Sequence, residues 1–130
     1  VAGAKSLEGF FSINSNWPGR KHQDLVARFK ARTGRPWMTS QGIDGYGQIQ
    51  IYREALEKAG VADRRRVAEQ IRRMDSSTGA ADYFTGPLKW DATGRRVGAG
   101  LVIAQWQGGQ PVPVYPPALA THKPIWAGKA

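Results

Sequence analysis

Helical periodicity is confined to the middle of this 130-residue chain, and the β-prone stretches are few and lie near its two ends. Over residues 21–33, a step of 100° per residue places Leu25, Val26 and Phe29 on one stripe. Gly34 follows directly as a C-terminal stop signal. The spacing therefore predicts an amphipathic helix over this segment.

Two more helices are predicted downstream. The first, residues 46–59, has a broad apolar face and ends at Gly60, so we expect it to be the most deeply buried helix. The apolar positions of that face are Ile49, Ile51, Tyr52, Ala55, Leu56 and Ala59. The second, residues 64–74, begins after Asp63, a favourable N-cap residue, and ends at the turn sequence of residues 76–79.

Strand signals flank the helices. Residues 7–14 and residues 101–106 have the short β-prone pattern of strands, and Gly108 and Gly109 then turn the chain. Residues 116–130 contain three of the eight prolines and are expected to form an extended tail. The composition is α/β, but a sheet built from these strands alone would be poor. We therefore expect missing strand partners and unpaired edges on both predicted strands.

The excess of basic residues raises the question of nucleic-acid binding. Lys and Arg number 19 against 10 Asp and Glu, a formal net charge of +9. The densest cluster is Arg64, Arg65, Arg66, Arg72 and Arg73. A helical projection places most of these side chains opposite the apolar positions of their helix, on a solvated face without aromatic neighbours. A basic nucleic-acid-binding domain is therefore the alternative hypothesis, and we predict no nucleic-acid partner.

Patterns typical of catalysis or metal binding are missing from the sequence. It contains no cysteine, and His22 and His122 are a hundred residues apart, without metal-ligand spacing. His22 falls beside the apolar stripe of its helix, so we expect it to pack there. No nucleophile-elbow or phosphate-loop motif is present, and nothing brings carboxylates such as Glu54 and Glu57 together around a cleft. We predict that the chain is not an enzyme and has no catalytic or metal-binding residues.

Four segments carry a family resemblance. They are Leu-Glu-Gly-Phe at 7–10, Gly-Tyr-Gly-Gln-Ile at 45–49 leading to Glu-Ala-Leu-Glu-Lys-Ala-Gly at 54–60, Gly-Pro-Leu-Lys-Trp-Asp at 86–91 with Gly94, and Val-Ile-Ala-Gln-Trp at 102–106 with Gly108. In this order and at this spacing they resemble the last part of type I periplasmic binding proteins, specifically the branched-chain amino acid group and its relatives.

The resemblance implies both fold and function. The fold class is α/β, the C-terminal part of a two-lobe type I periplasmic binding protein fold, incomplete on its own. Residues 1–16 would form a second-lobe strand segment, residues 17–100 a first-lobe helical and turn segment, and residues 101–130 the closing strands and the C-terminal tail. The sequence is expected to begin in the middle of the fold, since Val1 is neither an initiator Met nor part of a signal peptide.

The implied function is the solute-binding component of an ABC import system in the periplasm. Such a protein holds a small amino-acid-like or related organic solute between two lobes and delivers it to a membrane permease. The implied partners are the small-molecule ligand, the ABC permease and the N-terminal remainder of the same protein. No cofactor is implied.

The resemblance also suggests ligand-binding residues. In the family, the segment just before the helix at residues 46–59 reaches the cleft, so Gln41 is expected to be a polar ligand contact and Asp44 a contact or a helix cap. Trp17, at a Pro-Gly chain crossing, is expected to be a wall of the site. The sequence departs from the family at Gly47 and Gln48, where the family has Asp and Ala.

Overall fold

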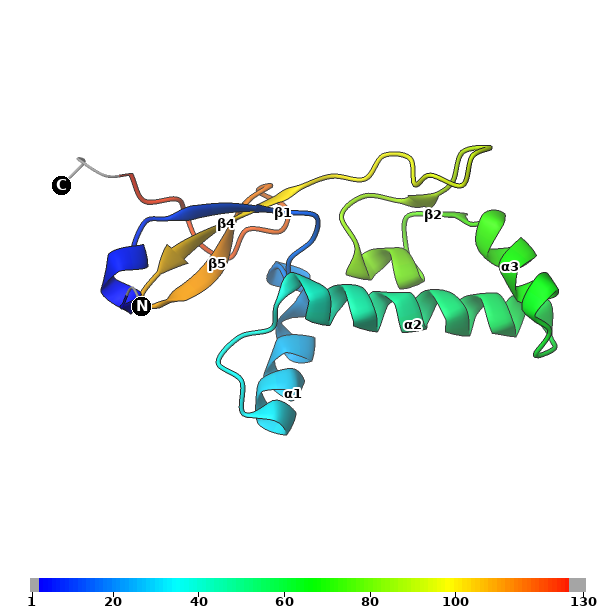
Figure 1. Ribbon diagram of the computed structural model, residues 1–130, viewed down its shortest axis with the longest axis horizontal. Helices are drawn as coiled ribbons and strands as arrows, with labels where there is room; N and C mark the ends of the chain where they lie inside the picture. Colours follow the sequence, from blue (N-terminus) through cyan, green and yellow to red (C-terminus); the bar gives the residue numbers. More distant parts are fainter. Residues whose placement is uncertain (1–2, 127–130) are drawn as a thin grey trace. The chain divides into compact units, whose positions relative to one another are not determined.

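The computed structural model describes residues 3–126, which form two compact units (Figure 1). Unit 1 combines the described residues up to Ser40 with those from Leu101 onward, and unit 2 is the continuous segment Gln41–Gly100. Both units contain helical and strand elements, and the two short strands of unit 2 were not predicted from the sequence. No helix within residues 3–126 has both the length and the apolar character needed to cross a membrane.

A three-stranded antiparallel sheet is the framework of unit 1. Its strands are β1 (Phe11–Asn14), β4 (Val102–Gln107) and β5 (Gln110–Tyr115), and β4 lies between the other two (Figure 1). Gly108 and Gly109 connect β4 to β5 with φ values of 60° and 81°, as a two-residue hairpin turn with two left-handed positions requires. The prediction of an unpaired edge on β4 was wrong, because the segment after this turn forms a strand of its own.

The first strand is shorter than predicted. Residues Ala4–Leu7 form a 3-10 helix, η1, and extended backbone begins only at Phe11. Gly9 has a φ of 83°, a left-handed conformation that interrupts an extended chain. The strand prediction over residues 7–14 was therefore wrong in its first half.

Helix α1 (Gln23–Thr33) confirms the first predicted helix and follows a short 3-10 helix, η2 (Arg20–His22). Gly34 ends α1 in the left-handed conformation, and its N–H donates to the carbonyl of Lys30. The His22 side chain is buried, and its Nδ1 accepts a hydrogen bond from the N–H of Gly19 at 2.9 Å. The expected packing role of His22 is confirmed.

The segment after β5 packs against unit 1 instead of forming only an extended tail. Leu119 and Ala120 are buried. The fully buried side chain of Gln105 donates to the carbonyl of Ile125 at 2.7 Å and accepts from its N–H at 2.9 Å. The last residues of the predicted tail, 127–130, lie outside the described residues.

Helix α2 (Ser40–Ala59) is the long helix of unit 2 and is followed by Gly60, as predicted. It starts six residues before the predicted start at Tyr46. Gly42 and Gly45 weaken the helix signal of this first part, but Ile43 is fully buried and packing overrides the local preference. The expectation that this is the most deeply buried helix is confirmed, since α2 has four buried residues and α1 has one.

The broad apolar face predicted for this helix was wrong. The buried residues of α2 are Ile43, Gly47, Ile51 and Ala55, which follow one another at intervals of four. Ile49, Tyr52 and Leu56, which the sequence placed on the same face, are 64%, 58% and 45% exposed. Two of the four buried residues, Gly47 and Ala55, have small side chains and admit close neighbours.

The rest of unit 2 packs on this stripe. Helix α3 (Arg64–Arg72) confirms the third predicted helix, and the Asp63 carboxylate caps it by accepting from the N–H groups of Arg65 and Arg66. After α3 come β2 (Asp75–Ser76), the 3-10 helix η3 (Gly79–Tyr83) and β3 (Leu88–Lys89), which pairs with β2. One core results, formed by Ile51, Ala55, Met74, Ala80, Ala81 and Leu88.

Candidate functional site

Trp17, the predicted wall residue, belongs to an irregular buried segment of unit 1, residues 16–19. Its side chain is 8% exposed and packs with Val102 and Ala104 of β4. The Asn16 side chain accepts a hydrogen bond from the N–H of Trp17 at 3.0 Å. The indole therefore packs against the sheet, and the Asn16 side chain holds the backbone of Trp17.

Contacts with the segment after β5 fix this loop further. A Cβ added to Gly19 would lie 2.6 Å from the carbonyl oxygen of Leu119, so only glycine fits there. The N–H of Arg20 donates to that same carbonyl at 3.0 Å, and the Arg20 guanidinium donates to the carbonyl of Ala120 at 3.0 and 3.2 Å. Trp17 thus lies on a rigid support.

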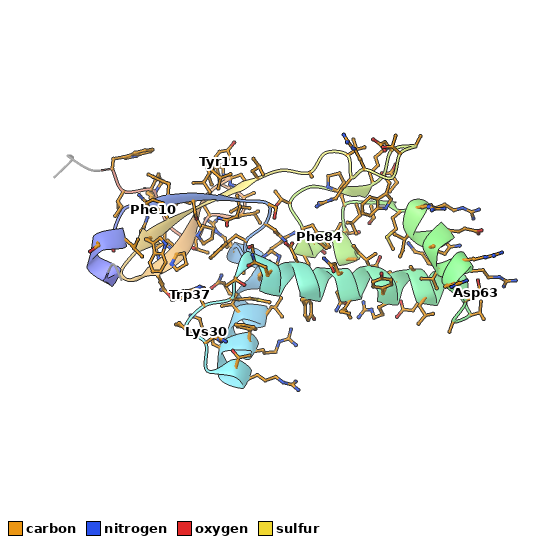
Figure 2. The ribbon with its side chains drawn as sticks, viewed as in Figure 1. Phe10, Lys30, Trp37, Asp63, Phe84 and Tyr115 are labelled. Carbon is orange, nitrogen blue, oxygen red and sulfur yellow. The ribbon has the colours of Figure 1, made fainter. Side chains whose placement is uncertain are left out.

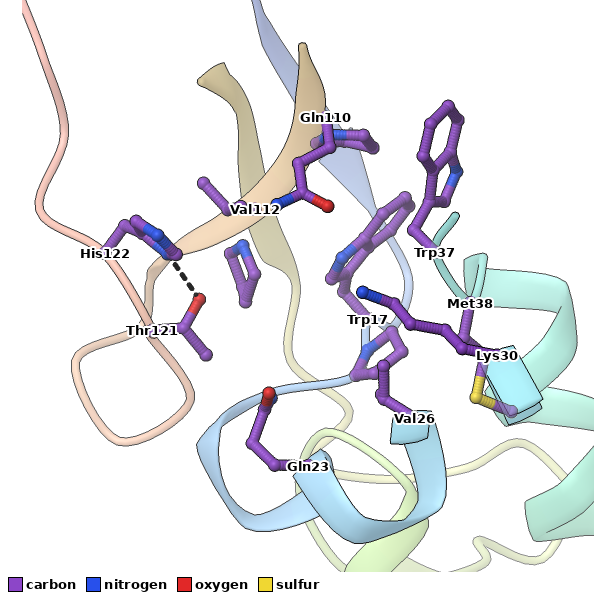
Figure 3. A pocket seen from close by; sticks show the side chains of 13 residues that line it. Trp17, Gln23, Val26, Lys30, Trp37, Met38, Gln110, Val112, Thr121 and His122 are labelled. Atoms are coloured by element: carbon purple, nitrogen blue, oxygen red, sulfur yellow. Dashed lines mark hydrogen bonds between the residues drawn. The ribbon is translucent and has the colours of Figure 1, made fainter. Parts of the chain in front are cut away.

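A pocket of ≈ 120 Å³ opens beside Trp17, and all of its lining residues belong to unit 1 (Figure 3). Its apolar walls come from tryptophan and proline side chains, and its polar groups come from α1, β5 and the segment after β5. The lining residues are Trp17, Pro18, Gln23, Val26, Lys30, Trp37, Met38, Gln110, Pro111, Val112, Pro113, Thr121 and His122. The pocket combines aromatic surface with one cation, and its lining contains no carboxylate.

Gln41 and Asp44, the other two predicted ligand contacts, belong to unit 2. Both lie within the first turns of α2, where a spacing of three places them on the same side of the helix. Gln41 is exposed and Asp44 is half-buried, and each has a polar or electrostatic partner in the described chain. Asp44 is inside the helix, so the alternative role of N-cap was wrong.

Arg96 is the electrostatic partner that the sequence did not indicate for Asp44. Its guanidinium donates to the backbone carbonyls of residues 85–87 at 2.7–2.9 Å and stacks over the ring of Phe84, 5.1 Å from its centre. Burial lowers the pKa of Arg96, and the charge of Asp44 opposes this effect. The Gly-Pro sequence at residues 86–87 indicates a turn whose backbone carbonyls can accept hydrogen bonds. Only the tertiary structure shows that Arg96 donates to them.

The departure from the family at Gly47 has a packing explanation. A Cβ added to Gly47 would lie 2.7 Å from two ring carbons of Phe84, which is shorter than the contacts that Cβ atoms make in real proteins. Phe84 is labelled in Figure 2. Glycine allows the aromatic ring to lie directly on α2, beside the edge-to-face pair of Tyr46 and Tyr83. Gln48, the other departure, is exposed.

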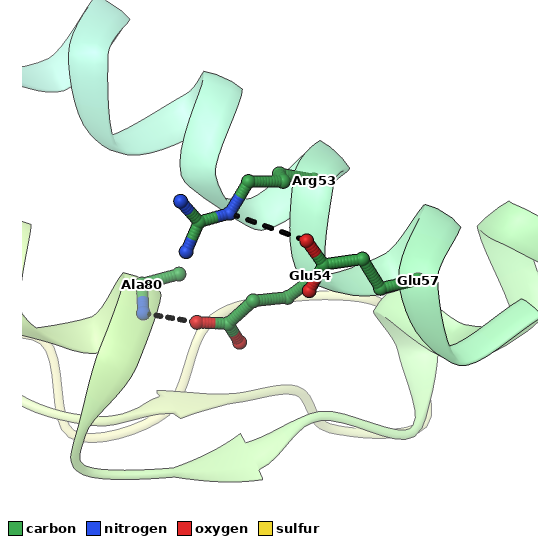
Figure 4. Close-up of polar contacts among 4 residues, drawn as sticks. All are labelled: Arg53, Glu54, Glu57 and Ala80. Atoms are coloured by element: carbon green, nitrogen blue, oxygen red, sulfur yellow. Dashed lines mark hydrogen bonds and ion pairs between the residues drawn. The ribbon is translucent and has the colours of Figure 1, made fainter.

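The carboxylates of α2 have separate structural partners (Figure 4). Glu54 accepts a hydrogen bond from the N–H of Ala80 at 2.6 Å, which ties η3 to α2. Glu57 forms an exposed ion pair with Arg53, 3.7 Å between Nε and Oε1. The two carboxylates therefore have different partners.

Asp91 stabilises the turn after β3. Its Oδ1 accepts from the hydroxyl and the N–H of Thr93 and from the N–H of Arg95 at 2.7–3.0 Å. The hydrogen bond from the Thr93 hydroxyl, followed by that from the Arg95 backbone, lowers the pKa of Asp91. Within residues 3–126, no group of three or more His, Cys, Asp or Glu is arranged to hold a metal ion.

The arginine cluster of α3 lies on the solvent side of unit 2. All five side chains are exposed, and Figure 2 shows the long side chains of α3 directed outward from a helix that begins after Asp63. Val67 and Ile71 face the core instead. The predicted solvated face is confirmed for these residues.

Comparison with known proteins identifies the family. The family model described as periplasmic binding protein matches residues 1–110. The chain belongs to this family. A curated relative, the Leu/Ile/Val-binding protein homolog 7 of Brucella suis, is 27% identical over 111 residues, which are 85% of this chain and 27% of that protein.

A solved structure agrees with this assignment. The crystal structure of the leucine-binding protein LivK of Thermotoga maritima superposes with a TM-score of 0.62 at 22% identity, over 84% of this chain and 31% of LivK. The predicted fold, part of a type I periplasmic binding protein, is confirmed. The chain spans less than a third of the length of each of these two proteins.

Proposed function

We propose that this chain is part of the solute-binding component of an ABC import system, a periplasmic protein that delivers a small amino-acid-like or related organic solute to a membrane permease. The observation that carries the proposal is the family match over residues 1–110. The two similar proteins are named for binding leucine, or leucine, isoleucine and valine, which supports a branched aliphatic amino acid as the solute. The proposed activity is accordingly binding, without a chemical reaction.

The solute would be held between two lobes, and closure of the lobes would produce the form that the permease recognises. In this proposal residues 1–16 belong to the second lobe, residues 17–100 to the first lobe, and residues 101–130 supply the closing strands and the tail. This assignment stays a prediction, because it concerns the complete two-lobe protein.

Three residues of the chain are proposed as solute contacts. The exposed amide of Gln41 offers both a donor and an acceptor at the start of α2. Asp44, one turn further along the same side, would accept from the solute ammonium. Trp17 would be an apolar wall, because its indole packs against β4.

The uncovered face of α2 supports a protein partner for unit 2. Ile49, Tyr52 and Leu56 form an exposed apolar stripe, and beside it a pocket of ≈ 190 Å³ is lined by residues that include Tyr52 and Trp90. The Trp90 Nε1 is buried and has no hydrogen-bond acceptor within residues 3–126. Large apolar patches of this kind mark interfaces. We expect the N-terminal remainder of the two-lobe protein to cover the stripe and to offer an acceptor to Trp90.

Titration calorimetry of the complete two-lobe protein with leucine tests the function. We expect Gln41→Ala and Asp44→Asn each to weaken leucine binding about tenfold, the equivalent of ~1.4 kcal/mol for a lost hydrogen bond to a charged group. Gln50→Ala is the matched control, since nine residues at 100° per residue place Gln50 on the opposite side of α2 from Gln41.

Two results would contradict the proposal. Failure of the complete protein to bind any amino acid or related small organic solute would remove the function itself. Full affinity in both the Gln41 and the Asp44 variants would instead leave the function intact and show that these two contacts are wrong.

A further inference from the structure

The pocket beside Trp17 has the composition of a small-ligand site. Its walls include the indoles of Trp17 and Trp37 and the rings of Pro111 and Pro113, and Lys30 brings a positive charge from α1. We propose that this pocket binds a small organic monocarboxylate with a compact apolar body, such as an aromatic ring. The proposal goes beyond the proposed function, with which it shares only Trp17, since Gln41 and Asp44 belong to unit 2 and do not line this pocket.

The size of the pocket sets the size of the apolar body. The volume of ≈ 120 Å³ is close to that of an apolar cavity of ~150 Å³ that accommodates benzene. A single six-membered ring or a branched chain of similar bulk fits this volume. Trp17 is almost fully buried and provides rigid aromatic surface, which favours flat apolar ligands.

Lys30 determines the charge of the ligand. Its side chain is exposed and reaches from α1 toward Trp17 at the pocket (Figure 3). Within residues 3–126, Lys30 forms no ion pair with a carboxylate. A bound carboxylate would therefore supply the counter-charge that the protein does not. The side-chain amide of Gln110, across the pocket on β5, offers a neutral donor to the same group.

The absence of carboxylates from the lining determines what the pocket rejects. An α-amino acid brings an ammonium group as well as a carboxylate, and no lining residue of this pocket offers that ammonium an opposite charge. Desolvating an unpaired charge is unfavourable. The pocket therefore prefers a simple organic acid to a zwitterionic amino acid, which separates its ligand from the solute proposed for the cleft.

The probe for this proposal is benzoate, with benzamide as its neutral counterpart of the same shape. The indole N–H signals of the ¹⁵N-labelled 130-residue chain are followed by NMR during titration with each compound. We expect benzoate to shift the Trp17 and Trp37 signals saturably and benzamide to bind at least fivefold more weakly. Lys30→Met should weaken benzoate binding about tenfold and leave benzamide binding unchanged. Because Lys30 is exposed, this variant should fold normally.

Lys58→Met is the matched control, because Lys58 is an exposed lysine near the end of α2 and lines none of this pocket. Equal affinity for benzoate and benzamide, or equal weakening by Lys30→Met and Lys58→Met, would overturn the role of Lys30. Saturable shifts confined to Trp90 and Trp126 would place the site elsewhere. Leucine binding as tight as benzoate at the Trp17 and Trp37 signals would contradict the preference against an ammonium group.

Discussion

The contacts inside unit 1 and those inside unit 2 join residues at very different separations in the sequence. In unit 1, the Gln105 side chain bonds to Gly9, 96 residues away, and Arg20 bonds to Ala120, 100 residues away. In unit 2, the corresponding tertiary bond from Glu54 to Ala80 spans 26 residues. Unit 2 is one continuous segment, whereas unit 1 is assembled from two segments that enclose it in the sequence.

The difference has consequences for how each unit is stabilised. Unit 1 has to close a long loop before its strands β1 and β4 meet, a step that is entropically unfavourable and slow. It offsets this loss with the hydrogen-bond ladders of β1, β4 and β5, which have one register shift at Ile103/Ala104, and with a fully bonded buried amide. Unit 2 depends more on apolar packing around α2 and needs fewer distant contacts. The two units should therefore respond separately to mutations.

The largest effect is expected from Leu88→Ala, in the core of unit 2. Leu88 is 1% exposed, so truncation should lower the free energy of unfolding of unit 2 by about 3–4 kcal/mol. Amide exchange measured by mass spectrometry should accelerate in α2 and α3 and change little in β4. Leu101→Ala, at a residue that is 59% exposed, is the control. Equal acceleration in both units would show that they unfold as one.

Gln105→Met tests unit 1 in the same way. The side chain is fully buried, and its loss leaves the carbonyl of Gly9 and both backbone groups of Ile125 without their partner. We expect a loss of about 2–3 kcal/mol in unit 1, measured by chemical denaturation, with exchange in unit 2 unchanged. Gln107→Met, at a half-buried position, should lower stability by less than ~1 kcal/mol. A similar loss in both variants would contradict the special role of Gln105.

Leu56→Ala measures how far unit 2 depends on a partner. In this chain Leu56 is 45% exposed, so we expect a loss below about 1 kcal/mol. In the complete two-lobe protein the same change should lower stability by about 2–5 kcal/mol, as truncation of a buried leucine does. Denaturation curves of both proteins give the comparison. An equally small loss in both would mean that the stripe on α2 stays exposed.

The smallest effect per substituted residue is expected from Arg65→Gln, Arg66→Gln, Arg72→Gln and Arg73→Gln combined. These side chains are exposed, and the quadruple change should alter the stability of unit 2 by less than about 0.5 kcal/mol per residue. Neither the unchanged chain nor the quadruple variant should retain a DNA or RNA oligomer near physiological ionic strength. Tight, salt-sensitive retention by the unchanged chain that is lost in the variant would instead support the nucleic-acid-binding alternative.

Sequence reasoning succeeded where the signal is local. Asp63 before α3, Gly34 after α1 and the Gly108-Gly109 turn act on their immediate neighbours, and all three behave as predicted. It failed where the residues were compatible with more than one helix start and with more than one buried helix face. Helix α2 starts at Ser40 despite two glycines, and its face with Ile49 and Tyr52 is exposed, because burial of Ile43 decides both the start and the rotation of the helix.

The residues of the candidate sites show the same contrast between local sequence signals and tertiary contacts. Trp17, Gln41 and Asp44 were proposed from sequence, whereas Arg96 and the Lys30 pocket came only from the structure. Their partners are distant or lie in unremarkable loops, so no local pattern marks them.

By itself the sequence determined the family, the three helices and the turns, because these depend on residue order and on interactions within a few positions. The tertiary structure decided that β4 is a central strand, that the segment after β5 packs on Gln105, and that the Phe84 ring lies directly against Gly47. Each of these depends on which distant atoms meet, and the free energy of such contacts depends on distance and burial, which residue order alone does not specify.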